Sequence, residues 1–185
     1  MTAQIQNSIS FDDKKYSIIA LQNELDFEPT TYGIDVDTGC SMCWRGYYCI
    51  FGIEKEQLVL KNWHILSKSK DEPPIIEKVQ AVRKNGMWYY TEMNYQMQYS
   101  GGMVIGTGFI EKYYIHMGYQ KVYAYETVIE LIFENGKLVE KIDHSEMFEN
   151  VRNTIDVQHR ELKDHIFENI GKMFSLRYED KFYKR

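Results

Sequence analysis

Apolar and polar residues alternate with a period of two along much of the chain, and this pattern predicts β-strands. Between 87 and 99, odd positions carry Met, Tyr or Thr, and even positions from 92 onward carry Glu, Asn or Gln. Between 122 and 134, rings and aliphatic side chains alternate with Glu126, Glu130 and Glu134. Successive side chains of a strand point to opposite faces. Each segment therefore predicts a long amphipathic strand, either straight or bent for 87–99, with its glutamates and amides facing water.

Turn residues between apolar runs predict how these strands are joined. Asn135-Gly136, followed by an apolar segment at 138–142, is a strong hairpin signal. The segments 47–53 and 58–66 predict a second hairpin around 54–57. The two hairpins match at a shift of 80 residues. A duplicated half and convergence on a common hairpin pattern both explain this match, and we favour convergence.

Shorter patterns complete the predicted sheet. Residues 17–21 and 103–110 predict further strands, and Gly106 and Gly108 within the second indicate a bulge or the close approach of another backbone. Pro73-Pro74 predicts the start of a short helix with Ile75, Val79 and Val82 on one stripe.

The period changes after Asp143, where apolar residues step by three, four or seven positions as far as Met173. This spacing predicts an amphipathic helix or a pair of helices broken near 153–156. Asp143 and Glu146 resemble a capping box at the helix start.

These elements predict an α+β protein with a mainly antiparallel, strongly curved sheet or partial barrel of hairpins and a C-terminal helical segment. We expect a flexible N-terminal segment over 1–15 and a single domain over 16–185. Within that domain, the β-rich core covers about 16–143 and the helical part 144–178. A chain of 185 residues is long enough to bury a core without disulfides.

Composition narrows the function classes. Lys and Arg total 22 against 27 Asp and Glu, which gives a formal charge of -5 and no basic footprint for nucleic acid. A basic protein partner fits this charge better. No apolar run is long enough for a membrane span, and the polar start does not resemble a signal peptide. We therefore expect a cytoplasmic protein that binds neither nucleic acid nor membranes.

Three cysteines, Cys40, Cys43 and Cys49, lie within ten residues. With His64 they could ligate a metal, but structural zinc sites usually have a second Cys pair or a His pair. We favour free thiols and expect no metal and no cofactor.

Aromatic residues make up 15% of the chain, and two aromatic segments attract attention as candidate sites. The first, at 43–48, combines rings with an arginine around a glycine; the second, at 113–119, places a histidine among phenols. Arginine and aromatic side chains dominate binding hot spots, although both segments also fit a strand start and a hydrogen-bonded turn. The candidate binding residues are Trp44, Arg45, Tyr47, His116, Tyr119, Tyr123 and Glu126.

Signals for catalysis are weak, and we assign no catalytic residue. Glu161, His165 and Glu168 share one face of the predicted helix and could grip a metal, but a solvated helix face has the same pattern. Phosphate-binding loops, dinucleotide-binding fingerprints and nucleophile elbows are absent from the sequence.

The two aromatic segments together resemble a group of bacterial proteins with a short β-rich core. The resemblance rests on 43–47 (Cys-Trp-Arg-Gly-Tyr) and 114–119 (Tyr-Ile-His-Met-Gly-Tyr), followed by Tyr123 and Glu126, and covers about 37–143. Cys40 is not part of this pattern. The group has no established activity, so the resemblance implies a β-rich fold and no catalytic residue.

Three functions remain open at this point. The first and favoured one is a non-enzymatic protein-binding module, resembling an immunity or inhibitor protein. The alternative is a small-molecule-binding β-barrel, or an enzyme, with an aromatic-lined pocket that holds His116 or several Tyr hydroxyls. The third is a homodimer formed through the C-terminal helix.

Overall fold

The computed structural model describes residues 2–158 and 175–182, with the side chains of 155–158 left out. The described residues contain ten strands: β1 Ser8–Phe11, β2 Lys14–Leu21, β3 Tyr47–Glu54, β4 Gln57–Leu66, β5 Val82–Lys84, β6 Met87–Tyr90, β7 Tyr95–Gln96, β8 Gly101–Phe109, β9 Tyr125–Glu134 and β10 Lys137–Asp143. The described helices are α1 Ser145–Gln158 and α3 Tyr178–Lys181, with 3-10 turns η1 Pro29–Tyr32, η2 Glu111–Tyr113 and η3 Val122–Ala124. The protein is α+β, as the sequence predicts.

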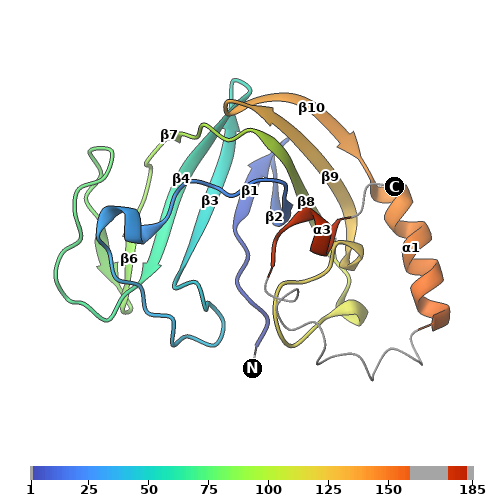
Figure 1. The fold of residues 1–185 in the computed structure, drawn as a ribbon, viewed down its shortest axis with the longest axis horizontal. Coiled ribbons are helices and arrows are strands. Elements are labelled where there is room, and N and C mark those ends of the chain that lie inside the picture. The colour runs from blue at the N-terminus through green and yellow to red at the C-terminus, as the bar shows by residue number, and fades with distance from the viewer. Residues whose placement is uncertain (1, 159–174, 183–185) are drawn as a thin grey trace.

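The strands form one strongly curved sheet in the order β10-β9-β8-β2-β1-β3-β4-β6-β5, and β7 pairs with β4 outside this order. Pairing is antiparallel between all neighbours in this order except β1 and β3, which run parallel. A further contact between Lys137 of β10 and Gln57 of β4 joins these two strands, so that the seven strands from β10 to β4 in this order form a ring. Figure 1 shows the strands arching around a common interior.

The turns of the two predicted hairpins explain how the ring closes. Asn135 and Gly136 between β9 and β10 have φ of 48° and 82°, and Lys55 and Glu56 between β3 and β4 have φ of 48° and 66°. Two consecutive positive φ angles are the geometry of a tight two-residue hairpin loop. Both hairpins are confirmed, and their turns lie against each other.

The interior of the ring holds the larger apolar core. Trp63 and Tyr90 are fully buried there among aliphatic side chains of β1 to β4 and β8 to β10. Phe27, from the segment after β2, packs its ring edge on Trp63 at 4.5 Å. Most strand aromatics are therefore core residues, which accounts for much of the aromatic content.

A second core lies on the outer face of β2, β8 and β9. Phe148 of α1 and Phe182 at the end of α3 pack there against Val104 and Val128. Figure 1 shows α1 on the outside of the sheet, beside β9 and β10. The face that the sequence assigned to water is thus partly covered, and Glu130 on it is completely buried.

The predicted strand at 87–99 is not continuous in the structure. It is interrupted between β6 and β7, where Glu92 and Asn94 have φ of 55° and 49°. Such left-handed residues cannot continue a strand. The side-chain alternation survives the interruption, because Met93 and Met97 remain buried on the inner side.

Other predicted elements shift at the chain ends and in the loops. The expected helix after Pro73-Pro74 is absent; Ile76 and Val79 pair in a tight turn instead. The segment 1–15, expected to be flexible, contains β1. At the other end, α1 runs through 153–156 without the break that one of the two alternatives placed there. Glu161, His165 and Glu168 lie outside the described residues.

No described helix has the length and apolar character to cross a membrane.

Candidate functional site

A cavity of about 530 Å³ lies at one end of the ring, on the side opposite the paired hairpin turns. Its walls come from the start of β3, the residue before β1, the end of β2 with the segment that follows it, and the C-terminal segment 175–179. Because β1 and β3 run parallel and β2 runs against them, their ends meet at this mouth. The volume falls within the range of about 300–1,000 Å³ that is typical of small-molecule sites.

Gly46 turns the chain so that its two neighbours face the cavity. It has φ of 74°, a value that favours glycine, and a Cβ there would lie 2.6 Å from the Cβ of Val36. Its amide donates to the Cys43 carbonyl at 2.9 Å. The turn delivers Arg45 and Tyr47 into the cavity wall.

Asn7 fixes the Arg45 side chain. The Arg45 Nη2 donates to the Asn7 Oδ1 at 3.0 Å, and the same oxygen accepts the Cys49 backbone amide at 2.9 Å. Asn7 is buried, so its amide cannot exchange these partners for water. The strand β3 and the residue before β1 thereby hold one guanidinium in a defined position.

Two phenol rings flank this guanidinium. Its central carbon lies 5.2 Å from the centre of the Tyr47 ring and 5.5 Å from that of Tyr119. Both distances allow cation–π attraction. Burial raises the pKa of Tyr47 and of Tyr119, and the opposing effect of Arg45 on each pKa is smaller. Both phenols therefore stay neutral at physiological pH.

The rest of the lining divides into an apolar wall and a polar rim. Apolar surface comes from Leu21, Leu25, Phe27, Cys49 and Phe51. At the rim, the Tyr47 hydroxyl donates to the Glu28 carboxylate at 3.3 Å, and Arg177 and Glu24 form an exposed ion pair at 3.9 Å. An exposed pair of this kind contributes little to stability.

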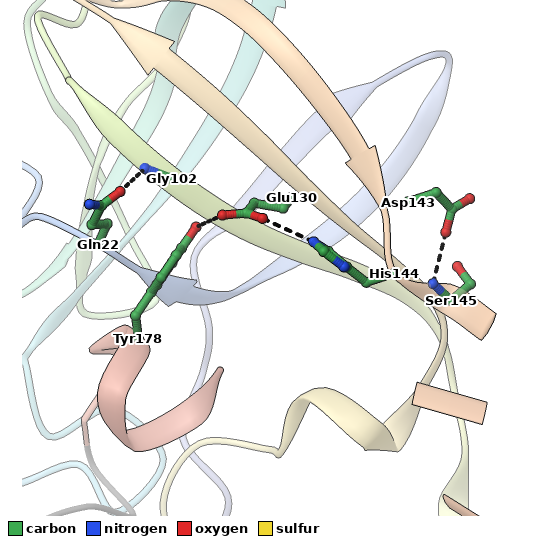
Figure 2. Close-up of polar contacts among 7 residues, drawn as sticks. All are labelled: Gln22, Gly102, Glu130, Asp143, His144, Ser145 and Tyr178. Carbon is green, nitrogen blue, oxygen red and sulfur yellow. Dashed lines mark hydrogen bonds and ion pairs between the residues drawn. The ribbon is translucent and has the colours of Figure 1, made fainter. Parts of the chain in front are cut away.

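The C-terminal wall of the cavity is anchored by a buried carboxylate. Figure 2 shows Glu130 of β9 between Tyr178 of α3 and His144. The Tyr178 hydroxyl donates to the Glu130 Oε1 at 3.1 Å, and the His144 Nε2 lies 2.9 Å from the Oε2. The Leu21 amide adds a bond of 2.7 Å to the Leu176 carbonyl. These contacts seat 176–178 beside the mouth.

Gly102 makes room for this anchor. A side chain at Gly102 would overlap the Tyr178 hydroxyl and would approach the Glu130 carboxylate. Its backbone groups are also hydrogen-bonded. The amide donates to the Gln22 Oε1 at 2.9 Å, as Figure 2 shows, and the carbonyl accepts the Tyr99 hydroxyl at 2.7 Å. Gly102 therefore links β8 to Gln22, in the segment after β2 that lines the cavity.

The structure brings three of the seven predicted site residues together: Arg45, Tyr47 and Tyr119 line the cavity. Trp44 is 40% exposed and lies outside the lining, with its amide donating to the Gln4 Oε1. His116 is exposed, and its ring packs on Tyr114 at 5.0 Å.

The last two predicted site residues are also away from the cavity. Tyr123 packs on Tyr113 at 5.5 Å, beside the outer core, and Glu126 is exposed next to Gly108. Asn7, Phe27 and the C-terminal wall, by contrast, belong to the site without having been predicted. The sequence gives one signal for Asn7: it is the polar residue on a strand face that otherwise carries Ile5, Ile9 and Phe11.

The cysteines and His64 are not arranged to bind a metal together. Cys49 faces the interior of the ring, whereas His64, on the adjacent strand, packs between Tyr48 and Tyr89 on the outer face. All three cysteines are free thiols. Within the part of the chain that the structure describes, no three His, Cys, Asp or Glu side chains are grouped to hold a metal.

Comparison of the chain with protein-family models, with curated proteins and with solved structures finds no match.

Proposed function

We propose that this protein binds a small organic molecule in the cavity at the mouth of the ring. The observation that carries the proposal is Arg45, a half-buried cation held by Asn7 between two phenol rings in the wall of a cavity. Small-molecule sites combine an apolar lining with a few precisely placed polar groups. The lining of this cavity has that composition.

Binding fits this cavity better than covalent catalysis. The thiol in the wall belongs to Cys49, and burial raises its pKa to about 12. A nucleophilic cysteine needs a pKa low enough to form thiolate near neutral pH. The neutral phenols of Tyr47 and Tyr119 serve as hydrogen-bond donors and as apolar surface.

A variant that fills the cavity tests the proposal. Leu25→Trp places a large ring on the lining, and Ile75→Trp, at a site that is 66% exposed, is the matched control. A library of small organic acids, amides and alcohols is screened by thermal shift against all three proteins. We expect hits for the wild type and Ile75→Trp that Leu25→Trp loses. The absence of any hit, or equal hits for all three proteins, would contradict the proposal.

A protein-binding surface is the second candidate, and an exposed aromatic cluster favours it. Phe109 and Tyr114 are 39% and 44% exposed, and their ring centres lie 6.4 Å apart. Such rings outside the core suit a protein interface, and the acidic balance of the chain suits a basic partner. Affinity capture with the wild type and with Tyr114→Ala tests this candidate, since the variant should lose the captured protein.

A further inference from the structure

We infer that the ligand of the cavity is an organic monocarboxylate whose acid group binds Arg45. This inference rests on the proposed function and adds the chemical class of the ligand. An arginine guanidinium offers five N–H donors in one plane. Only one described contact, from Nη2 to Asn7, uses them within the protein.

The Arg45 Nε is a buried donor for which the described residues supply no acceptor. It is buried without a hydrogen-bond partner, and no ion pair among the described residues includes Arg45. A buried donor that makes no hydrogen bond costs free energy, because it has lost its bonds to water. A carboxylate would supply the acceptor, and its two oxygens match the planar fork of a guanidinium.

The flanking rings favour this geometry. Tyr47 and Tyr119 each lie within 6 Å of the guanidinium carbon, so the plane of the fork is restrained before a ligand arrives. Restraint of a side chain in its bound geometry reduces the entropy lost on binding. The neutral phenols also place no competing negative charge beside Arg45.

The charge of the lining separates a monoanion from a phosphate. Three carboxylates, from Glu24, Glu28 and Glu179, share the lining with two arginines, Arg45 and Arg177. Arg177 already pairs with Glu24. Glu28 and Glu179 then share the lining with one guanidinium that has no ion pair, so they repel the second charge of a dianion, whereas the single charge of a monoanion is matched by Arg45.

The apolar wall defines the remainder of the ligand. Leu21, Leu25, Phe27 and Phe51 form a surface next to the arginine, in a volume that accepts a single ring or a short chain. Burial of such a body supplies binding energy in proportion to its apolar area. The ligand class is thus an aryl or short alkyl carboxylic acid.

Matched acids and amides test the charge requirement directly. Calorimetric titrations use 3-phenylpropionate, hexanoate and indole-3-acetate, each beside its carboxamide, and phenyl phosphate as the dianion. We expect at least one acid to bind about tenfold or more tightly than its amide, because a charge-assisted bidentate pair is lost in the amide. Phenyl phosphate should bind more weakly than that acid.

Arginine variants assign the effect to Arg45. Arg45→Lys keeps the charge and loses the fork, and Arg45→Gln loses both. Arg83→Gln is the control, because Arg83 stacks on Trp88 on β5 and β6, away from the lining. Circular dichroism shows whether each variant folds, and Arg45→Lys keeps the test decisive if Arg45→Gln does not. We expect Arg45→Gln to lose the preference for acid over amide, and Arg45→Lys to keep only a reduced preference because it retains the charge without the planar fork.

The outcomes distinguish this inference from the proposed function. Acids and amides that bind equally well, with binding lost in Leu25→Trp, would overturn the carboxylate and leave the cavity as a binding site. A preference for phenyl phosphate, or an acid preference that is undiminished in Arg45→Lys or that survives in Arg45→Gln, would also overturn it. Failure of every acid and amide to bind, together with an empty library screen, would overturn both.

Discussion

Leu58 and Leu138 occupy matching places in the two hairpins that close the ring. The Leu58 amide donates to the Gly136 carbonyl, and the Leu138 amide donates to the Glu56 carbonyl, each at 2.7 Å. The two donors are 80 residues apart in the sequence, and so are the two acceptors, so the contact is reciprocal. This pair of bonds holds the end of the ring opposite the cavity.

Replacement of Gly136 should therefore weaken ring closure. A Cβ at Gly136 would overlap the Met97 carbonyl and the Gln57 side chain, and the residue has φ of 82°. We expect Gly136→Ala to lower the free energy of unfolding by about 2–4 kcal/mol, from overlap and left-handed strain together. Urea unfolding followed by tryptophan fluorescence measures the change.

Gly86 provides the control, because it sits in another Asn-Gly turn with φ of 80° and nothing within 4 Å of its would-be Cβ. Gly86→Ala should cost only about 1 kcal/mol, from backbone strain alone. Equal losses in the two variants would refute a special role for Gly136 in closure.

The hydrogen bond from the Tyr178 hydroxyl to the buried carboxylate of Glu130 should stabilise the fold. Tyr178→Phe removes a donor from a fully buried acceptor. We expect a loss of about 1.5–3 kcal/mol, the usual range for hydrogen bonds to charged groups. Tyr114→Phe, at an exposed tyrosine, should change the free energy of unfolding by less than about 0.5 kcal/mol. If both variants have the same free energy of unfolding as the wild type, the hydrogen bond from Tyr178 to Glu130 does not stabilise the fold.

Lys181 should make stability rise with pH above neutrality. Burial, followed by repulsion from Lys121, lowers its pKa from 10.5 to about 7, and its Nζ donates to the Tyr119 carbonyl at 2.9 Å. Between pH 7 and pH 10.5 the unfolded chain holds a proton that the folded protein lacks. The free energy of unfolding therefore increases with pH across this window, and below pH 7 the penalty is present in full.

Lys181→Met isolates this effect. The stability of the wild type relative to the variant should increase by about 1–3 kcal/mol between pH 7 and pH 9.5. Lys84→Met, at an exposed lysine of β5, is the control for general effects of charge. A wild-type advantage that is independent of pH would mean that Lys181 keeps an ordinary pKa in the fold.

The cysteines should differ sharply in reactivity. Burial raises the pKa of Cys49 to about 12 and also raises that of Cys43, whereas Cys40 is half-buried. Alkylation with iodoacetamide at pH 8 should modify Cys40 first and spare the other two until urea unfolds the chain. Cys40→Ser should remove the fast reaction. Rapid modification of Cys49 in the folded protein would contradict the burial of the cavity wall.

The sequence predicts the parts of the fold that depend on local chemistry. Asn135-Gly136 specifies its hairpin because few residues tolerate two positive φ angles in succession, and the period-two pattern assigns most of the inner core. The parallel pairing of β1 with β3 and the covering of Glu130 have no local signal, since both depend on segments distant in the chain. Glu130 looks solvated until α3 is placed on it.

The candidate site divides in the same way. Arg45 and Tyr47 were predicted because an arginine among rings is an unusual composition, and Tyr119 joins them across the fold. His116 belongs to the same aromatic segment as Tyr119, yet its side chain lies on the surface. Asn7 acts through one oxygen shared between Arg45 and Cys49, a relationship that only the folded register creates.

The most direct test of the central claim observes the Arg45 Nε–H by NMR. Its ¹H–¹⁵N signal, assigned by its disappearance in Arg45→Lys, is followed during titration with 3-phenylpropionate, hexanoate and indole-3-acetate, and with their amides. The account predicts that an acid shifts this signal downfield in a saturable way, because the buried N–H gains an anionic acceptor, and that its amide does not. A signal that no acid moves, or that acid and amide move alike, would contradict the account.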